Sequence, residues 1–269
     1  MGRFGSTVNV TADGPITTWT LDRPPANGIG ESEIDAMRAS LDELASEGSE
    51  TRALLITAHG RFFSAGVDLQ LVQENMELAD GPDRMVAIIS RYQSVLADIE
   101  ALAIPTVCAM NGNALGGGLE LALACDFRIA SDEAKYGLPE INLGLLPGAG
   151  GTQRLPRIIG RPAALRLILR GESVSGAEAE RIGLAHWSVP SDDVVSRGVE
   201  LARQLAGRSA LATKAIKRAI AESARPGGHG YQIELDTTRA LMTDPTARAE
   251  VLAFFQARAA ARTSQGASS

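Results

Sequence analysis

The sequence has little lysine and a net negative charge, whereas proteins that bind nucleic acids or anionic membranes carry clustered basic residues. Lysine occurs only at Lys135, Lys214 and Lys217, and arginine supplies the rest of the positive charge. Acidic residues outnumber basic ones by 32 to 26, which gives a formal net charge of −6. Binding to nucleic acids or anionic membranes requires a basic patch or stripe. We therefore expect neither a nucleic-acid partner nor a membrane partner.

Cysteine and histidine are too few and too scattered to form a recognisable metal site. The two cysteines, Cys108 and Cys125, lie in apolar runs, and their spacing matches no metal-binding motif. We expect both to be reduced thiols of the core. The three histidines, His59, His186 and His229, belong to no motif and are expected to be surface or ordinary hydrogen-bonded residues.

No apolar run has the length and purity of a membrane span. The longest, residues 102–125, contains Pro105, Asn111 and Glu120. Residues 1–6 show no apolar signal region. The hydrophobic content of 45% and the charged content of 22% are ordinary for a globular protein with a large core. We expect a cytoplasmic location.

Three familiar catalytic and nucleotide-binding motifs are also missing. Ser64 lies in Phe-Ser-Ala-Gly, which is not the Gly-x-Ser-x-Gly turn of serine hydrolases. No Gly-x-Gly-x-x-Gly follows an expected strand, and no Gly-x-x-x-x-Gly-Lys-Ser/Thr occurs anywhere. Serine-hydrolase, dinucleotide and P-loop chemistry are therefore disfavoured.

The periodicity of apolar residues predicts an α/β fold in which strands occupy about residues 1–150 and helices occupy the remainder. We expect strands over 7–21 (a hairpin), 53–58, 106–110, 127–130 and 134–137, with loops over 22–28 and 60–69. We expect helices over about 32–44, 82–101, 116–125, 152–159, 162–170, 176–183, 192–206, 209–223, 230–242 and 246–260.

Two glutamates stand alone in otherwise apolar or glycine-rich sequence. Glu120 is the only charged residue in Ala114–Cys125, and Glu140 is the only one in Gly137–Gly148. A buried carboxylate without a partner is costly, so a chain seldom keeps one for stability alone. Burial also raises the pKa of a carboxyl group, which suits it to proton transfer near neutral pH. The two glutamates predict an acid/base pair.

A glycine run at the start of an expected helix can expose backbone N–H groups to a ligand. Gly116–Gly118 is such a run, although glycine triplets are also common in ordinary loops. Glu120 lies three residues beyond Gly117, which places it on the same helical face. A backbone donor near Ala65–Gly66, in the loop after a buried strand, could pair with the N–H of Gly117 to form an oxyanion hole.

Two neighbouring features allow both a structural and a functional interpretation. Asp68 is either a loop residue that caps the next element or part of the site. The second glycine cluster, Pro147–Thr152, is either a helix-entry loop or a source of N–H groups for the site.

Several segments carry a resemblance that covers nearly the whole chain. They are Arg23–Asn27, Phe63–Leu69 (Phe-Ser-Ala-Gly-Val-Asp-Leu), Asn111–Asp126 and Tyr136–Pro156. With these motifs in order and at family-like spacing, the sequence resembles the enoyl-CoA hydratase/isomerase (crotonase) superfamily. The resemblance implies an α/β fold built as a spiral of ββα units over residues 1–200. It also implies a helical trimerisation region over 201–269 and assembly as a homotrimer or homohexamer.

The resemblance also implies roles for individual residues. The N–H groups of Val67 and Gly117 would hold the thioester oxygen, Glu120 would activate a water, and Glu140 would protonate the α-carbon. Gly148 matches a glycine whose N–H helps to orient that water. Substrate-binding residues are expected to be Ala65, Asp68, Leu69, Gly116 and Leu138.

The chain departs from the family pattern at three positions. Gln70 stands where some hydratases have a lysine near the CoA phosphates, Leu138 replaces a frequent glutamine, and Ala257 occupies a position that is often lysine. These departures concern CoA contacts and acyl-chain preference, and the depth of the acyl pocket is expected to depend on residues 70–90. The two glutamates are unaffected.

The function implied is hydration of trans-2-enoyl-CoA thioesters to 3-hydroxyacyl-CoA by syn addition of water. No metal or separate cofactor is expected, because coenzyme A is part of the substrate. Isomerases of the family often lack a carboxylate at the position of Glu120, so its presence favours hydration over double-bond migration. Two alternatives stay open: another thioester reaction on this scaffold, such as Δ3–Δ2 isomerisation, and a non-catalytic acyl-CoA-binding subunit.

Overall fold

The computed structural model describes residues 7–46, 48–223 and 227–266, and side chains as far as residue 258. Contacts between Cα atoms divide the chain into two compact units, with the boundary between Ala206 and Gly207. All strands of the described residues lie in the first unit, and the second unit consists of helices.

The first unit is built on a six-stranded sheet with the order β1-β2-β4-β7-β9-β12. Only β1 is antiparallel to its neighbour, and the remaining pairs are parallel. The strands are β1 (Val8–Asp13), β2 (Ile16–Leu21), β4 (Ala53–Ala58), β7 (Thr106–Met110), β9 (Phe127–Ser131) and β12 (Trp187–Val189). Every residue of β4 and β7 is buried, because a central parallel strand is covered on both faces.

A smaller four-stranded sheet follows the order β11-β10-β8-β5, and β3 pairs with β6 in a third, two-stranded sheet. These strands are β3 (Gly28–Ile29), β5 (Phe62–Ser64), β6 (Gly66–Val67), β8 (Asn113–Leu115), β10 (Lys135–Gly137) and β11 (Ser173–Ser175). The successive pairs β4/β5, β7/β8 and β9/β10 each place one strand in the large sheet and the next in the small one, before a helix follows. The expected spiral of ββα units is confirmed.

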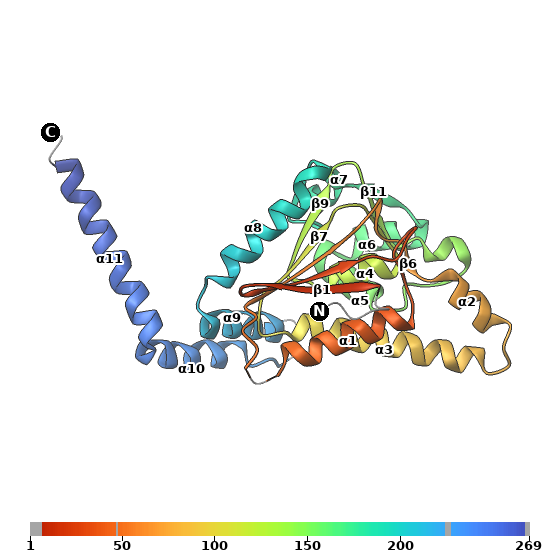
Figure 1. The fold of residues 1–269 in the computed structure, drawn as a ribbon, viewed down its shortest axis with the longest axis horizontal. Coiled ribbons are helices and arrows are strands. Elements are labelled where there is room, and N and C mark those ends of the chain that lie inside the picture. Colours follow the sequence, from red (N-terminus) through yellow and green to blue (C-terminus); the bar gives the residue numbers. More distant parts are fainter. Residues whose placement is uncertain (1–6, 47, 224–226, 267–269) are drawn as a thin grey trace. The chain divides into compact units, whose positions relative to one another are not determined.

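Helices cover both faces of the large sheet (Figure 1). On one face, Leu55 and Ala109 pack against α8, where a Cβ at Gly198 would lie 2.9 Å from Cβ of Ala109. On the other face, Leu54 and Cys108 join the larger core cluster that includes α1, α3 and α4. The helices of this unit are α1 (Glu31–Leu44), α2 (Leu69–Met76), α3 (Gly81–Ala101), α4 (Gly117–Leu123), η1 (Glu140–Leu143), α5 (Gly151–Ile159), α6 (Arg161–Arg170), α7 (Gly176–Arg181), η2 (Ser191–Asp193) and α8 (Val194–Ala206).

The second unit contains three helices in the described residues: α9 (Ala210–Ser223), α10 (Gly230–Thr243) and α11 (Pro245–Gly266). Helices α9 and α10 pack against each other. The sequence prediction of helices over 209–223, 230–242 and 246–260 is confirmed, whereas a trimerisation role for this region stays a prediction.

Two predictions about secondary structure were wrong. The chain beyond residue 150 is not purely helical, because β11 and β12 lie there. Residues 60–69 are not simply a loop, because they contain β5 and β6, and α2 begins at Leu69. Each of these strands has only two or three residues, which is too short for side-chain alternation to be recognised. Their partners lie far away in the sequence.

None of the helices in the described ranges is both long enough and apolar enough to cross a lipid bilayer.

Candidate active site

A cavity of about 570 Å³ opens beside the N-terminus of α4. Its walls consist mainly of apolar side chains from α2, α3 and residues 143–146, together with Asn75 of α2 and backbone at Gly66, Gly116 and Gly117. Among the residues that line it, only Glu120 and Glu140 carry ionisable side chains. A largely apolar pocket with a few convergent polar groups is typical of a small-molecule site.

Glu120 lies on the first turns of α4, and its side chain is held by backbone donors. Its Oε1 accepts hydrogen bonds from the N–H groups of Ala149 at 2.8 Å and Gly151 at 2.7 Å. The turn that supplies these donors contains Gly150 at φ +107°, a left-handed conformation that favours glycine. A Cβ at Gly151 would lie 3.0 Å from this same oxygen, so the close approach also requires glycine.

The environment of Glu120 shifts the pKa of its carboxyl group to near neutral pH. Burial raises the pKa of this carboxyl group to about 7. The N–H donors of Gly151 and Ala149 act in the opposite direction because they stabilise the ionised form, and the charge of Glu140 raises the pKa further. Glu120 is therefore able to exchange a proton at physiological pH.

Glu140 is the first residue of η1, and it lines the same cavity as Glu120. Its Oε2 is buried and has no hydrogen-bond partner among the described residues. Its Oε1 would lie 3.0 Å from a Cβ placed on Gly116. Burial raises the pKa of Glu140, so this carboxyl group also holds a proton more readily than an exposed one. The two acids predicted from the sequence are brought together.

Two backbone N–H groups lie beside this acid pair. Gly117 is the first residue of α4, so its N–H has no acceptor within the helix. The N–H of Asp68 donates to Ile29, and strand alternation therefore turns the N–H of Val67 to the opposite side. A Cβ at Gly117 would lie 3.2 Å from the nitrogen of Val67, and one at Gly66 would lie 2.9 Å from the nitrogen of Gly117. Both nitrogens therefore lie beside the start of α4. That they bind one oxygen atom together stays a prediction.

Most of the residues predicted for the site line the cavity, and two do not. The residues that line it are Ala65, Val67, Leu69, Gly116, Gly117, Glu120, Glu140 and Gly148. Asp68 instead caps α2 by accepting the N–H of Gln70 at 2.9 Å, and it pairs with Arg23 at 2.5 Å. Leu138 is fully buried, and its Cδ1 would lie 2.8 Å from a Cβ at Gly151. Contacts of Asp68 and Leu138 with substrate stay predictions.

Several residues that position the site were not predicted from the sequence. Arg154 of α5 donates to the carbonyl of Ala149 at 3.1 Å and pairs with Glu100 at 3.0 Å. Gln93 of α3 donates to the carbonyl of Gly148 at 2.6 Å. The only sequence signal was the glycine cluster at 147–152, and both of its interpretations hold, since Gly151 begins α5 and also donates to Glu120.

Cys108 and Cys125 are buried and free, as predicted. Within residues 7–46, 48–223 and 227–266, no group of three or more His, Cys, Asp or Glu side chains could hold a metal ion.

Comparison with known proteins agrees with this geometry. A family model described as enoyl-CoA hydratase/isomerase matches residues 11–260. A probable enoyl-CoA hydratase of Bacillus subtilis is 38% identical over 203 residues, which cover 75% of this chain and 77% of that protein. An enoyl-CoA isomerase/hydratase of Mycosarcoma maydis is 37% identical over 248 residues, covering 88% and 89% of the two chains.

A solved structure shows the same fold. The enoyl-CoA hydratase from Bacillus anthracis superposes with a TM-score of 0.84 at 33% identity, covering 94% of this chain and 97% of that one. The crotonase-like fold predicted from the sequence is thus confirmed. By sequence, fold and the matched segments, the chain belongs to the enoyl-CoA hydratase/isomerase family.

Proposed function

We propose that the chain hydrates trans-2-enoyl-CoA thioesters to 3-hydroxyacyl-CoA by syn addition of water. The observation that supports this most strongly is the presence of two carboxyl groups with raised pKa values in one apolar cavity, beside two backbone donors. Hydration needs one group to remove a proton from water and another to deliver a proton to carbon. Glu120 and Glu140 are suited to these two roles.

The backbone donors would bind the thioester oxygen. When water adds to C3, electrons move from the double bond towards the carbonyl, and negative charge grows on that oxygen. The N–H groups of Val67 and Gly117 favour this charge because they are fixed before the reaction. Removal of one such donor typically costs about 2.7–4 kcal/mol of transition-state stabilisation.

The proton transfers then balance as follows. Ionised Glu120 takes one proton from water as the oxygen of that water bonds to C3. Protonated Glu140 gives its proton to C2, so the product carries a hydroxyl on C3 and a new hydrogen on C2. Glu120 ends protonated and Glu140 ends ionised, and exchange with solvent restores the starting states. The two N–H donors on Glu120 favour its ionised form, which is the form a base requires.

Coenzyme A enters this proposal as part of the substrate, and no further cofactor takes part. We also propose that the protein assembles as a homotrimer or homohexamer through α9–α11, as its family resemblance implies. Sedimentation equilibrium would measure the assembly directly, and a monomeric mass would contradict it.

Substitution of each acid tests the proposed chemistry. Glu120→Gln and Glu140→Gln keep the side-chain shape but remove the proton carrier. Each should lower kcat for crotonyl-CoA hydration by at least about 10²-fold, since a positioned acid or base typically contributes that much. Binding of CoA thioester and the circular dichroism spectrum should be unchanged. Glu74→Gln, at an exposed position on α2, is the matched control and should keep full activity.

The alternatives give different products in the same assays. An isomerase would convert 3-enoyl-CoA into 2-enoyl-CoA without forming a hydroxyacyl product, a reaction of interest because the Mycosarcoma maydis relative is described as an isomerase/hydratase. A non-catalytic subunit would bind CoA thioesters of several chain lengths without turnover. Full hydration activity in either glutamine variant would contradict the proposed mechanism.

A further inference from the structure

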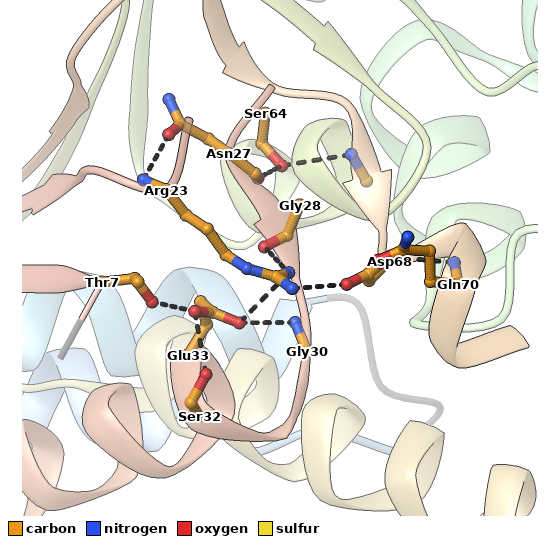
Figure 2. A network of polar contacts seen from close by, with 11 residues as sticks. Thr7, Arg23, Asn27, Gly28, Gly30, Ser32, Glu33, Ser64, Asp68 and Gln70 are labelled. Atoms are coloured by element: carbon orange, nitrogen blue, oxygen red, sulfur yellow. Dashed lines mark hydrogen bonds and ion pairs between the residues drawn. The ribbon is translucent and has the colours of Figure 1, made fainter. Parts of the chain in front are cut away.

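Arg23 lies outside the cavity. Its guanidinium group nevertheless contacts three separate segments of the chain (Figure 2). Its Nη1 donates to the carbonyl of Gly28 at 2.9 Å and lies 3.7 Å from Oε2 of Glu33. Its Nη2 donates to Oδ2 of Asp68 at 2.5 Å. One guanidinium group therefore connects β3, the start of α1 and the residue that follows β6.

The α1 end of this network is itself fixed. Glu33 is buried, and its Oε2 accepts the N–H of Gly30 at 2.7 Å. Its Oε1 accepts hydrogen bonds from Ser32 at 3.0 Å and from the hydroxyl of Thr7. Glu33 cannot move without breaking these bonds. Its carboxylate therefore restrains the guanidinium group of Arg23 on the side away from Asp68.

The Asp68 end lies next to the proposed oxyanion donor. Asp68 directly follows Val67, and its own N–H donates to Ile29 at 2.9 Å. Its side chain caps α2 through Gln70. Burial raises the pKa of Asp68, but the hydrogen bonds from Arg23, Gln70 and Leu71 and the charge of Arg23 together lower it by more, so the net pKa is below its usual value.

A second set of hydrogen bonds holds the residue on the other side of Val67. The N–H of Gly66 donates to the hydroxyl of Ser64 at 3.1 Å, and that hydroxyl donates to the carbonyl of Asn27 at 2.7 Å. Asn27 in turn accepts the backbone N–H of Arg23 at 2.8 Å through its side chain. The segment 22–30 thus holds the chain both before and after Val67, although it does not line the cavity.

Only arginine can make these contacts together. Its planar fork donates in two directions at once, towards Gly28 and towards Asp68, whereas a lysine ammonium is a single point on a flexible stem. An exposed ion pair contributes little to stability, because solvent screens it and its long side chains lose freedom. The side chain of Asp68 is 19% exposed and that of Glu33 is 3% exposed, so this network is shielded more than a surface pair.

We infer that Arg23 is a positioning residue for the reaction: acting through Asp68, it holds the N–H of Val67 at the place where the thioester oxygen binds. This inference rests on the oxyanion hole of the proposed function. It goes beyond that function because it assigns a kinetic role to a residue that touches neither the substrate nor the catalytic acids.

The carbonyl stretch of a bound thioester reports the strength of the oxyanion hole directly. Butyryl-CoA is saturated and cannot be hydrated, so its complex is stable, and a ¹³C label identifies the thioester carbonyl in infrared difference spectra. Binding to the wild-type protein should lower the stretching frequency, because two donors polarise the C=O bond. Arg23→Met should return most of this shift towards the frequency in water.

Kinetics should change in parallel. Arg23→Met should lower kcat for crotonyl-CoA hydration by about 10- to 100-fold, somewhat less than deletion of an oxyanion donor. KM should change by less than about threefold, because the displaced donor acts mainly on the transition state. A residue that contributed only to stability would alter neither the carbonyl frequency nor kcat of the folded protein.

Asp68→Ser supplies an independent variant if Arg23→Met folds poorly. Serine is also a good N-cap residue, so α2 keeps its cap while the ion pair with Arg23 is lost. This variant should show the same frequency change, and the double variant should lose no more than either single one. Arg91→Met is the matched control, because it removes ion pairs with Glu31 and Asp35 of α1 and should leave the carbonyl frequency unchanged.

The outcomes distinguish a failure of the proposed oxyanion hole from a failure of the role assigned to Arg23. If the wild-type protein binds butyryl-CoA without any lowering of the carbonyl frequency, the oxyanion hole and with it the proposed mechanism are wrong. If the wild type shows the lowering and either folded variant, Arg23→Met or Asp68→Ser, keeps it in full, the role of Arg23 is overturned while the proposed function stands.

Discussion

The carboxylate of Glu140 occupies space that any side chain at Gly116 would need. A Cβ at Gly116 would lie 3.0 Å from Oε1 and 3.6 Å from the carboxyl carbon of Glu140. Gly116 also has φ +51°, a left-handed conformation that a residue with a Cβ adopts only with strain. The glycine run therefore has two functions: it lets α4 begin beside the cavity, and it leaves room for the second acid.

Gly116→Ala should therefore reduce activity more than it reduces stability. The added methyl group pushes the carboxylate of Glu140 away from its position, and we expect kcat to fall at least about tenfold. The free energy of unfolding should fall by about 1–2 kcal/mol from backbone strain. Gly14→Ala is the matched control, because Gly14 has φ +55° with nothing within 4 Å of a Cβ. It should show a similar loss of stability and keep full activity; equal activity of both variants would refute the steric argument.

The pH dependence of hydration should report the raised pKa of Glu120. The base must be ionised, and its pKa is about 7, so the acidic limb of the kcat/KM profile should have its midpoint near pH 7, while ionisation of the proton donor Glu140 should give an alkaline limb. Below that point the rate should fall about tenfold per pH unit. Initial rates in buffers of constant ionic strength measure this profile. A midpoint near 4.5, the value of an ordinary glutamate, would show that the base is not buried as described.

Removal of the charge of Glu120 should stabilise the protein at high pH. In the folded state the pKa is raised from 4.5 to about 7, so this group favours folding most below pH 4.5 and loses that contribution as pH rises through 7. Glu120→Gln stays neutral at every pH. Between pH 4.5 and 8 the unfolding free energy of the wild type should drop by about 3 kcal/mol relative to that of the variant. Urea titrations of both proteins across this range measure the difference, and parallel curves would contradict the raised pKa.

Arg154 does not line the cavity, but it should lower the pKa of the proposed base, Glu120. Its positive charge lowers the pKa of Glu120, and its side chain holds the carbonyl of Ala149. Arg154→Met should therefore move the acidic limb of the pH profile to higher pH. Arg157→Met, on the same helix at an exposed position, should leave the limb in place. If the midpoint of the acidic limb is unchanged in Arg154→Met, this arginine has no electrostatic effect on Glu120.

Strands that are buried on both faces were predictable from the sequence. The runs over 53–58 and 106–110 are apolar except for Thr57 and Thr106, and the structure gives β4 and β7 these same bounds. Strands β3, β6 and β8 were not predicted, because two or three residues carry no readable alternation and their pairing is set by distant partners. The ββα spiral itself came from the family resemblance, since the local pattern contained only half of its strands.

The acids of the site were predictable for a different reason. Glu120 and Glu140 are isolated charges in apolar sequence, and isolation is visible without a structure. The groups that support them are not visible in this way. Arg154 and Arg23 lie among many arginines, and only the fold shows that one holds the loop of Ala149 while the other holds Asp68.

Hydration in isotopically labelled water tests the central claim most directly. The purified protein is incubated with crotonyl-CoA in H₂¹⁸O and, separately, in D₂O, and the product is examined by mass spectrometry and NMR. The mechanism predicts 3-hydroxybutyryl-CoA with ¹⁸O on C3 in the first solvent. In D₂O it predicts one deuterium on C2, on the same face as the new hydroxyl. Recovery of unlabelled crotonyl-CoA, or of an isomer without a hydroxyl group, would contradict the account.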